Sequence, residues 1–296
     1  MVPIRPTMFG GFVQTCAHGN RPFRLYPYTT LNEKLKFLDN AQLQPGQMPS
    51  LGYWAIGDMG HRVVTVNQRA KIKPVDHLPD HAALYNQCPF VMRPSNDDLP
   101  PELRRLYAGR VEMTHTDGRN YVQYWLKRLV MDNVIPTMNN NILNPDGTWG
   151  VEEYVTDSDN LNPTWPEIEV DSATTTTGNF TSSSMVIPIA FTKRDVDEYL
   201  RVATILYGSE DEAVISEIAF CTGVDRQISI ATPSGSVNFM EAAAVQIDTF
   251  CSAYYQLVFE NEGFEFAMEM GVSDPLLGAQ QYNGAAVVGV TGLKQP

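Results

Sequence analysis

The chain has 296 residues, of which 43% are hydrophobic, so it is long enough to bury one large core or two ordinary ones without disulfides or metals. Its 21 basic against 34 acidic residues give a net charge of −13. That charge argues against a nucleic-acid surface, because the phosphate backbone would be repelled. The densest basic segments, 69–73 and 104–105, are short, and we interpret them as solvated faces.

The four cysteines are far apart in the sequence and form no C-x-x-C pair, so we expect reduced and mostly buried thiols. No run of about 18 apolar residues is present, and a membrane span is therefore not predicted. The first residues lack the apolar core of a signal peptide. These features favour synthesis and folding in a cytoplasm.

Residues 1–29 combine prolines and glycines, which oppose regular structure, with aromatic side chains, which need burial. An extended arm laid on another surface satisfies both demands, and that surface is either the arm's own domain or a neighbouring subunit. The tail 278–296 is rich in Gly, Ala and Val with almost no charge, and it has the same character. The apolar residues expected to make these contacts are Phe9, Phe12, Phe23, Tyr26, Tyr28, Tyr282, Val287 and Val288.

Residues 30–170 are predicted to form a β-rich domain. A capping box at Thr30 and Glu33 starts a short helix that should end near Asn40. Segments 53–56 and 62–66 have the composition of strands, and the glycines between them favour a hairpin.

A second hairpin is predicted over 111–126, because two alternating segments flank the turn dipeptide Asp117-Gly118. From residue 133 to 165 the chain is rich in Asn, Asp, Pro and Gly, which is typical of loops at the rim of a β-rich domain.

His77 and His81 have an H-x-x-x-H spacing beside Asp76 and Asp80. On a helix the two imidazoles would share a face and could hold a metal ion. Pro79 lies between them, however, and belongs at a helix start, which leaves His77 outside the helix. No glutamate follows the first histidine as a zinc-protease motif requires. Capping and surface roles are therefore favoured, and no cofactor is predicted.

Segment 171–184 is small, polar and of low complexity, so it is expected to be an exposed loop or a linker. It is the candidate boundary between the domain at 30–170 and an α+β domain at 185–277.

The second domain should open with a buried strand over 185–191, which is an apolar run bounded by polar residues. Thr192 with Asp195 then marks a helix start, and apolar residues recur at three- and four-residue spacing until Gly208.

Ser209 restarts the helical pattern with three acids in the first turn, so a second helix ending near Gly223 would complete a helical hairpin near 193–220. A strand at 213–220 is the alternative, since short apolar runs do not distinguish the two. Further on, 226–231 alternates as a strand, and 252–259 with 264–270 should form a closing hairpin with one buried and one solvated face.

The predicted fold class is α+β: β-rich, with sandwich-like antiparallel sheets, a helical hairpin near 193–220 and extended terminal arms. The chain has no nucleophile elbow, phosphate-binding loop, dinucleotide fingerprint or zinc-protease motif. No catalytic residue is therefore predicted, and we expect that the protein is not an enzyme.

Two segments, Tyr121-Val122-Gln123-Tyr124-Trp125-Leu126-Lys127-Arg128-Leu129 and Arg226-Gln227-Ile228-Ser229-Ile230, resemble virion structural proteins of tailed bacteriophages. The second segment, with the closing hairpin, is similar to the C-terminal region of baseplate wedge proteins in contractile-tailed phages. The resemblance implies a virion subunit of β-sandwich type that contacts copies of itself and other virion proteins. It carries over no catalytic residue, and it leaves baseplate, neck, collar and head-proximal ring open as positions.

The alternative is a ligand-binding module or hydrolase with a cleft between 30–170 and 185–275. Its carboxylates, which would recruit a divalent cation or a glycan, are Asp157, Asp159, Glu169 and Asp171. Their spacing fits no Ca²⁺ loop, which needs acids and glycine at fixed positions.

Overall fold

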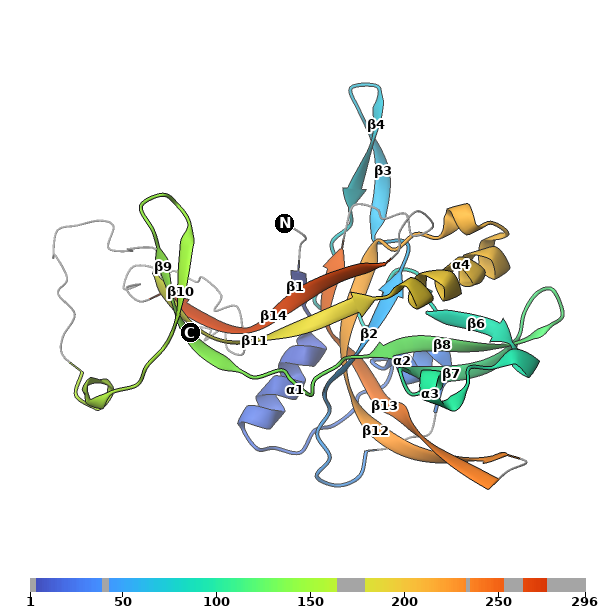
Figure 1. Cartoon of the computed structure of the whole chain (residues 1–296), viewed down its shortest axis with the longest axis horizontal. Helices are drawn as coiled ribbons and strands as arrows, with labels where there is room; N and C mark the ends of the chain where they lie inside the picture. The colour runs from blue at the N-terminus through green and yellow to red at the C-terminus, as the bar shows by residue number, and fades with distance from the viewer. Residues whose placement is uncertain (1–3, 39–42, 164–178, 233–234, 253–262, 276–296) are drawn as a thin grey trace. The chain divides into compact units, whose positions relative to one another are not determined.

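The computed structural model describes residues 4–38, 43–163, 179–232, 235–252 and 263–275 (Figure 1). The chain divides into two compact units, the first formed by residues 1–130 with 189–266 and the second by residues 131–188 with 267–296. The prediction of a β-rich α+β fold with antiparallel sheets is confirmed. The predicted division into domains at 30–170 and 185–277 is corrected, because strands from both stretches pair within one sheet.

Within the described residues, the first unit contains an eight-stranded sheet whose pairings are all antiparallel. Its main path runs, in spatial order, through β1 (Ile4–Pro6), β13 (Gly235–Ser252), β12 (Glu217–Thr232), β2 (Ser50–Gly57), β8 (Asn120–Arg128) and β6 (Val91–Pro94). Two further strands, β5 (Gln87–Cys88) and β7 (Tyr107–Thr114), pair with β2 and β8.

The other elements of the first unit are a two-stranded ribbon and short or amphipathic helices. They are β3 (His61–Val66), β4 (Arg69–Pro74), α1 (Met8–His18), α2 (Leu31–Leu35), α3 (Pro101–Arg104), α4 (Lys193–Tyr207), and the 3₁₀ turns η1 (Ser95–Asp97) and η3 (Glu210–Glu212).

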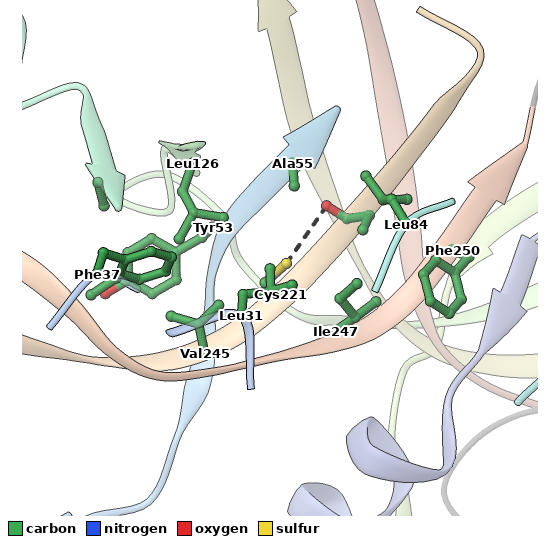
Figure 2. Close-up of a cluster of buried hydrophobic side chains, with 13 residues drawn as sticks. Leu31, Phe37, Tyr53, Ala55, Leu84, Leu126, Cys221, Val245, Ile247 and Phe250 are labelled. Atoms are coloured by element: carbon green, nitrogen blue, oxygen red, sulfur yellow. Dashed lines mark hydrogen bonds between the residues drawn. The ribbon is translucent and has the colours of Figure 1, made fainter. Parts of the chain in front are cut away.

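Strand β2 is central because its apolar run is buried on both faces of the sheet. Tyr53 and Ala55 point into a cluster that also contains Leu31 of α2 and Ile247 of β13 (Figure 2). On the opposite face Trp54 packs edge-on against other aromatic rings, with its centroid 4.8 Å from that of Phe90. A strand that is buried on both faces needs a continuous apolar run rather than an alternating one.

The predicted helix start at Thr192 and Asp195 is confirmed in α4, where the two residues form a capping box. The Thr192 hydroxyl accepts from the Asp195 amide, and the Asp195 carboxylate accepts from the Thr192 amide at 2.6 Å. Gly208 ends the helix with a φ of 88°, a conformation that glycine adopts without strain. The same Asp195 carboxylate accepts from the Lys127 ammonium at 2.6 Å and from the Tyr107 hydroxyl at 2.7 Å, which ties the helix to β7 and β8.

The prediction of a second helix, which would complete the helical hairpin near 193–220, is wrong. Ser209 does cap a helical turn, but that turn is only η3, and β12 begins at Glu217. Residues 217–223 pair with β2 on one side while 217–232 pair with β13 on the other, so two sets of ladder hydrogen bonds favour the strand. The alternative of a strand at 213–220 is correct from residue 217 onward.

The prediction of an extended N-terminal arm is also corrected, because residues 8–18 form α1. Thr7 caps α1 by accepting from the Gly10 amide at 3.0 Å, while its own amide donates to the Asp248 carbonyl at 2.8 Å. The described part of the segment therefore covers its own unit, which is one of the two surfaces expected for it. Gly10 permits the contact, because a Cβ there would lie 2.8 Å from the Asp248 Cα.

Gly10→Ala is expected to lower the free energy of unfolding by about 1–3 kcal/mol, because the methyl group must displace backbone of β13. The matched control is Gly11→Ala, where a Cβ meets nothing within 4 Å. The control should stabilise the protein by about 0.5–1 kcal/mol through helix propensity. Urea unfolding of both variants checks this; equal midpoints for the two would contradict the packing of α1 on β13.

Other local predictions were partly wrong. The strands at 53–56 and 62–66 exist, but β3 pairs with β4 and not with β2. The hairpin at 111–126 is confirmed as β7 and β8, with Gly118 at a φ of 80° in its turn. The helix after Thr30 is confirmed and ends at Leu35, earlier than expected. Strand 264–270 is confirmed within β14, whereas 253–259 lies outside the described residues.

The second unit contains a four-stranded sheet within its described residues. The spatial order is β10 (Trp149–Glu153), β9 (Thr137–Leu143), β11 (Phe180–Phe191) and β14 (Phe264–Pro275), and a 3₁₀ turn η2 (Ser158–Leu161) follows β10. Strands β11 and β14 each begin or end in the first unit. The loops predicted over 133–165 are thus partly strand, and 180–184 of the predicted linker belongs to β11; residues 171–178 lie outside the described part.

Candidate functional site

His77 and His81 lie together, but no helix holds them. The chain turns at Pro79 and Asp80, and the two Nδ1 atoms are 3.2 Å apart. His77 is 2% exposed, so the surface role predicted for it is wrong. Its ring is stacked between those of Tyr85 and Phe250, with centroids at 4.2 and 3.8 Å.

Glu217 explains why a polar ring can be buried there. Its carboxylate accepts from the amides of Tyr85 and Asn86 at 3.1 and 3.0 Å, and it lies 2.8 Å from His77 Nε2. The contact orients the His77 ring, so that Nε2 lies against the Glu217 carboxylate and Nδ1 lies against His81. The two histidines could offer a metal ion two nitrogen ligands, but among the described residues no set of three or more metal-ligating side chains converges. We assign this network a structural role.

The carboxylates of the ligand-binding alternative do not form a site in the described part of the chain. Asp157 caps η2, with its side chain accepting from the Asp159 amide at 2.9 Å. Glu169 and Asp171 lie outside the described residues. The two stretches that were to flank a cleft share a sheet through β2 and β12, and residues of both stretches line the cavity described below.

The N-terminal contact candidates form an aromatic cluster on the first unit. The Phe12 ring lies 5.5 Å from that of Phe23 and 5.8 Å from that of Tyr26, while Phe9 is half-buried on α1. Tyr28 is 86% exposed. The C-terminal candidates, Tyr282, Val287 and Val288, lie outside the described residues.

Four apolar residues share one face of the four-stranded sheet, and we call them the apolar face: Leu143, Trp149, Val151 and Phe180. Trp149 is directly opposite Leu143, and Val151 and Phe180 are both opposite Asn141, so the pleat sends their side chains to the same side. The rings of Trp149 and Phe180 are 5.1 Å apart. Trp149 is 49% exposed and Val151 is 63% exposed.

The second unit buries little apolar surface elsewhere in its described residues, where the buried hydrophobic side chains are Ile187 and Met268. Its other exposed large apolar residues are Ile135, Met138, Val155, Leu161 and Val186. Sequence reasoning missed the apolar face, because the asparagines and glycines of 139–150 favour loops. The alternation of Trp149 and Val151 was the available signal.

A cavity of about 300 Å³ lies in the first unit. It is lined by residues 104–128 on one side and by the β12–β13 hairpin, residues 225–241, on the other. Three arginines and two carboxylates line it. The solvated face predicted for 104–105 is correct for Arg105, which is exposed, and wrong for Arg104, which is buried.

No helix within the described ranges is both long and apolar enough to cross a membrane. Comparison with curated proteins and with solved structures finds no match to this chain. A family of unknown function, DUF7208, matches residues 2–285, and the chain belongs to that family.

Proposed function

We propose that the protein is a structural subunit of a tailed-phage virion, in the tail baseplate or neck, and that it acts through contacts with copies of itself and with other virion proteins. The observation that carries the proposal is the exposed apolar face of the four-stranded sheet. No catalytic role, cofactor or direct contact with nucleic acid belongs to the proposal.

A sheet buries at least one face against another layer, and burial contributes about 25 cal/mol per Å² of apolar surface removed from water. Trp149 and Val151 instead leave about half or more of their surface exposed. Exposed apolar patches of this kind mark protein contacts in soluble proteins.

The two segments that resemble phage proteins lie in neighbouring parts of one sheet, β8 and β12, each paired with β2. Residues 121–126 of β8 are mostly buried, so the first segment belongs to the core of the first unit. Residues 226–230 of β12 pair with β13 and are half-buried or exposed, so the second segment lies outside that core. The apolar face lies in the other unit, where it is available for assembly.

Val151→Asp is expected to weaken self-association of the full chain by about tenfold or more, because a carboxylate at a contact must lose its water. The matched control is Val63→Asp, since Val63 of β3 is 65% exposed and lies on a strand of the other unit. Sedimentation velocity over a range of protein concentrations measures the effect. A wild-type chain that stays monomeric throughout, or a Val151→Asp chain that assembles like the wild type, would contradict the proposal.

A further inference from the structure

We propose that the cavity between residues 104–128 and the β12–β13 hairpin binds a small oxyanion, a phosphate or carboxylate group, through Arg104 and Arg105. This site is independent of the apolar face and of the assembly role.

The environment of the Arg104 side chain is the main observation behind the proposal. It is 9% exposed, and its guanidinium lies over the Phe239 ring at 4.0 Å from the centroid. Within the described residues its side chain makes no ion pair. Burial lowers its pKa below the ordinary value, which means that the surroundings do not fully compensate the charge. A buried cation without a bonded counter-ion is costly, and an anion entering the cavity would relieve that cost.

The two carboxylates that line the cavity are already engaged. Asp225 accepts from Arg128 Nη1 at 2.6 Å and from the Tyr53 hydroxyl. Glu241 accepts from the amides of Gly109 and Ala242 at 2.6 and 2.9 Å. Neither carboxylate bonds Arg104, although Glu241 and Asp98 are close enough to raise its pKa somewhat.

The lining therefore has an excess of positive charge. Arg104, Arg105 and Arg128 face Asp225 and Glu241, which gives 3 − 2 = +1 in a chain whose net charge is −13. Guanidinium groups bind carboxylate and phosphate oxygens through paired N–H donors, which favours these anions over halides. The volume of about 300 Å³ lies at the lower end of the range for ligand pockets, so the ligand should be small.

Calorimetry of the full chain at low salt, with inorganic phosphate and separately with citrate, tests the proposal. We expect saturable binding of at least one of the two, weakened about tenfold by Arg104→Met, which removes the charge but keeps an apolar side chain over Phe239. The tighter of the two probes identifies a phosphate or a carboxylate ligand.

Two further variants control for the possibility that Arg104→Met fails to fold. Arg105 is exposed, so Arg105→Met should fold normally and still weaken binding by roughly threefold. Arg201 of α4 is exposed and lies outside the cavity, and Arg201→Met should bind like the wild type. Absence of heat with both anions, or equal affinity in Arg105→Met and Arg201→Met, would overturn the proposal.

Discussion

Glu217→Gln is expected to lower the free energy of unfolding by about 3–5 kcal/mol, which is the cost of breaking a buried, hydrogen-bonded charge network. Glu217 is 1% exposed, and its carboxylate has three partners: His77 and the amides of Tyr85 and Asn86. Glutamine keeps the volume, but it places an amide NH₂ against groups that donate. At least one donor then stays buried without an acceptor.

Urea unfolding at neutral pH measures this effect, and Glu210→Gln is the control. Glu210 lies in η3, close to Glu217 in sequence, and is exposed. Its replacement should change stability by less than about 0.5 kcal/mol. A Glu217→Gln protein as stable as the control would show that the network contributes nothing.

Asp195→Asn is expected to destabilise the protein by about 3–5 kcal/mol at pH 7, because it leaves the Lys127 ammonium, whose side chain is only 12% exposed, without its counter-ion. Burial by itself raises the pKa of Asp195, but Lys127 and the bonds from Thr192 and Tyr107 outweigh burial and hold that pKa below its ordinary value of 3.8. The ionised carboxylate is therefore the form that folding favours.

The sign of the pH dependence follows from that shift. Because the folded-state pKa lies below the unfolded one, the contribution of Asp195 is fully present above about pH 4 and is lost as the pH falls through the lower, folded value. The stability difference between wild type and Asp195→Asn should therefore shrink on acidification below pH 4. Chemical unfolding at a series of pH values measures this.

Asp197→Asn on the same helix is the control. Asp197 pairs with Lys193 at 3.1 Å, but both side chains are more than half exposed. An exposed pair of this kind contributes about 0–1 kcal/mol, so the control should follow the wild type across the pH range. If Asp195→Asn also followed the wild type, α4 would not be anchored by this ion pair.

Elements with local signals could be predicted from the sequence. Helix α4 has a capping box at one end and Gly208 at the other, and both act within a few residues. The β7–β8 hairpin is similar, because Asp117-Gly118 favours the turn regardless of the rest of the fold.

Elements that depend on distant partners could not be predicted. Strand β12 follows a segment with helical capping signals, and pairing with β2 and β13 decides its conformation. Strand β13 was missed altogether, because both of its faces are buried between residues 242 and 250 and it shows no alternation. The β3–β4 turn uses Asn67 and Gln68, both at positive φ, and glutamine at such a position gives no turn signal.

The contacts within the candidate sites could likewise be predicted only where the residues are close together in the sequence. The four-residue spacing of His77 and His81 indicated that they could meet, and they do. Glu217 is 140 residues from His77 in sequence, and Phe239 lies on a different element from Arg104, so neither contact leaves a local pattern.

The virion assignment is tested most directly by protein mass spectrometry of purified phage particles released from cells in which the chain is produced. We expect peptides of the chain in the particle fraction, at a constant ratio to the other tail proteins through successive density gradients. Recovery of the chain only in the particle-free fraction of the lysate would contradict it.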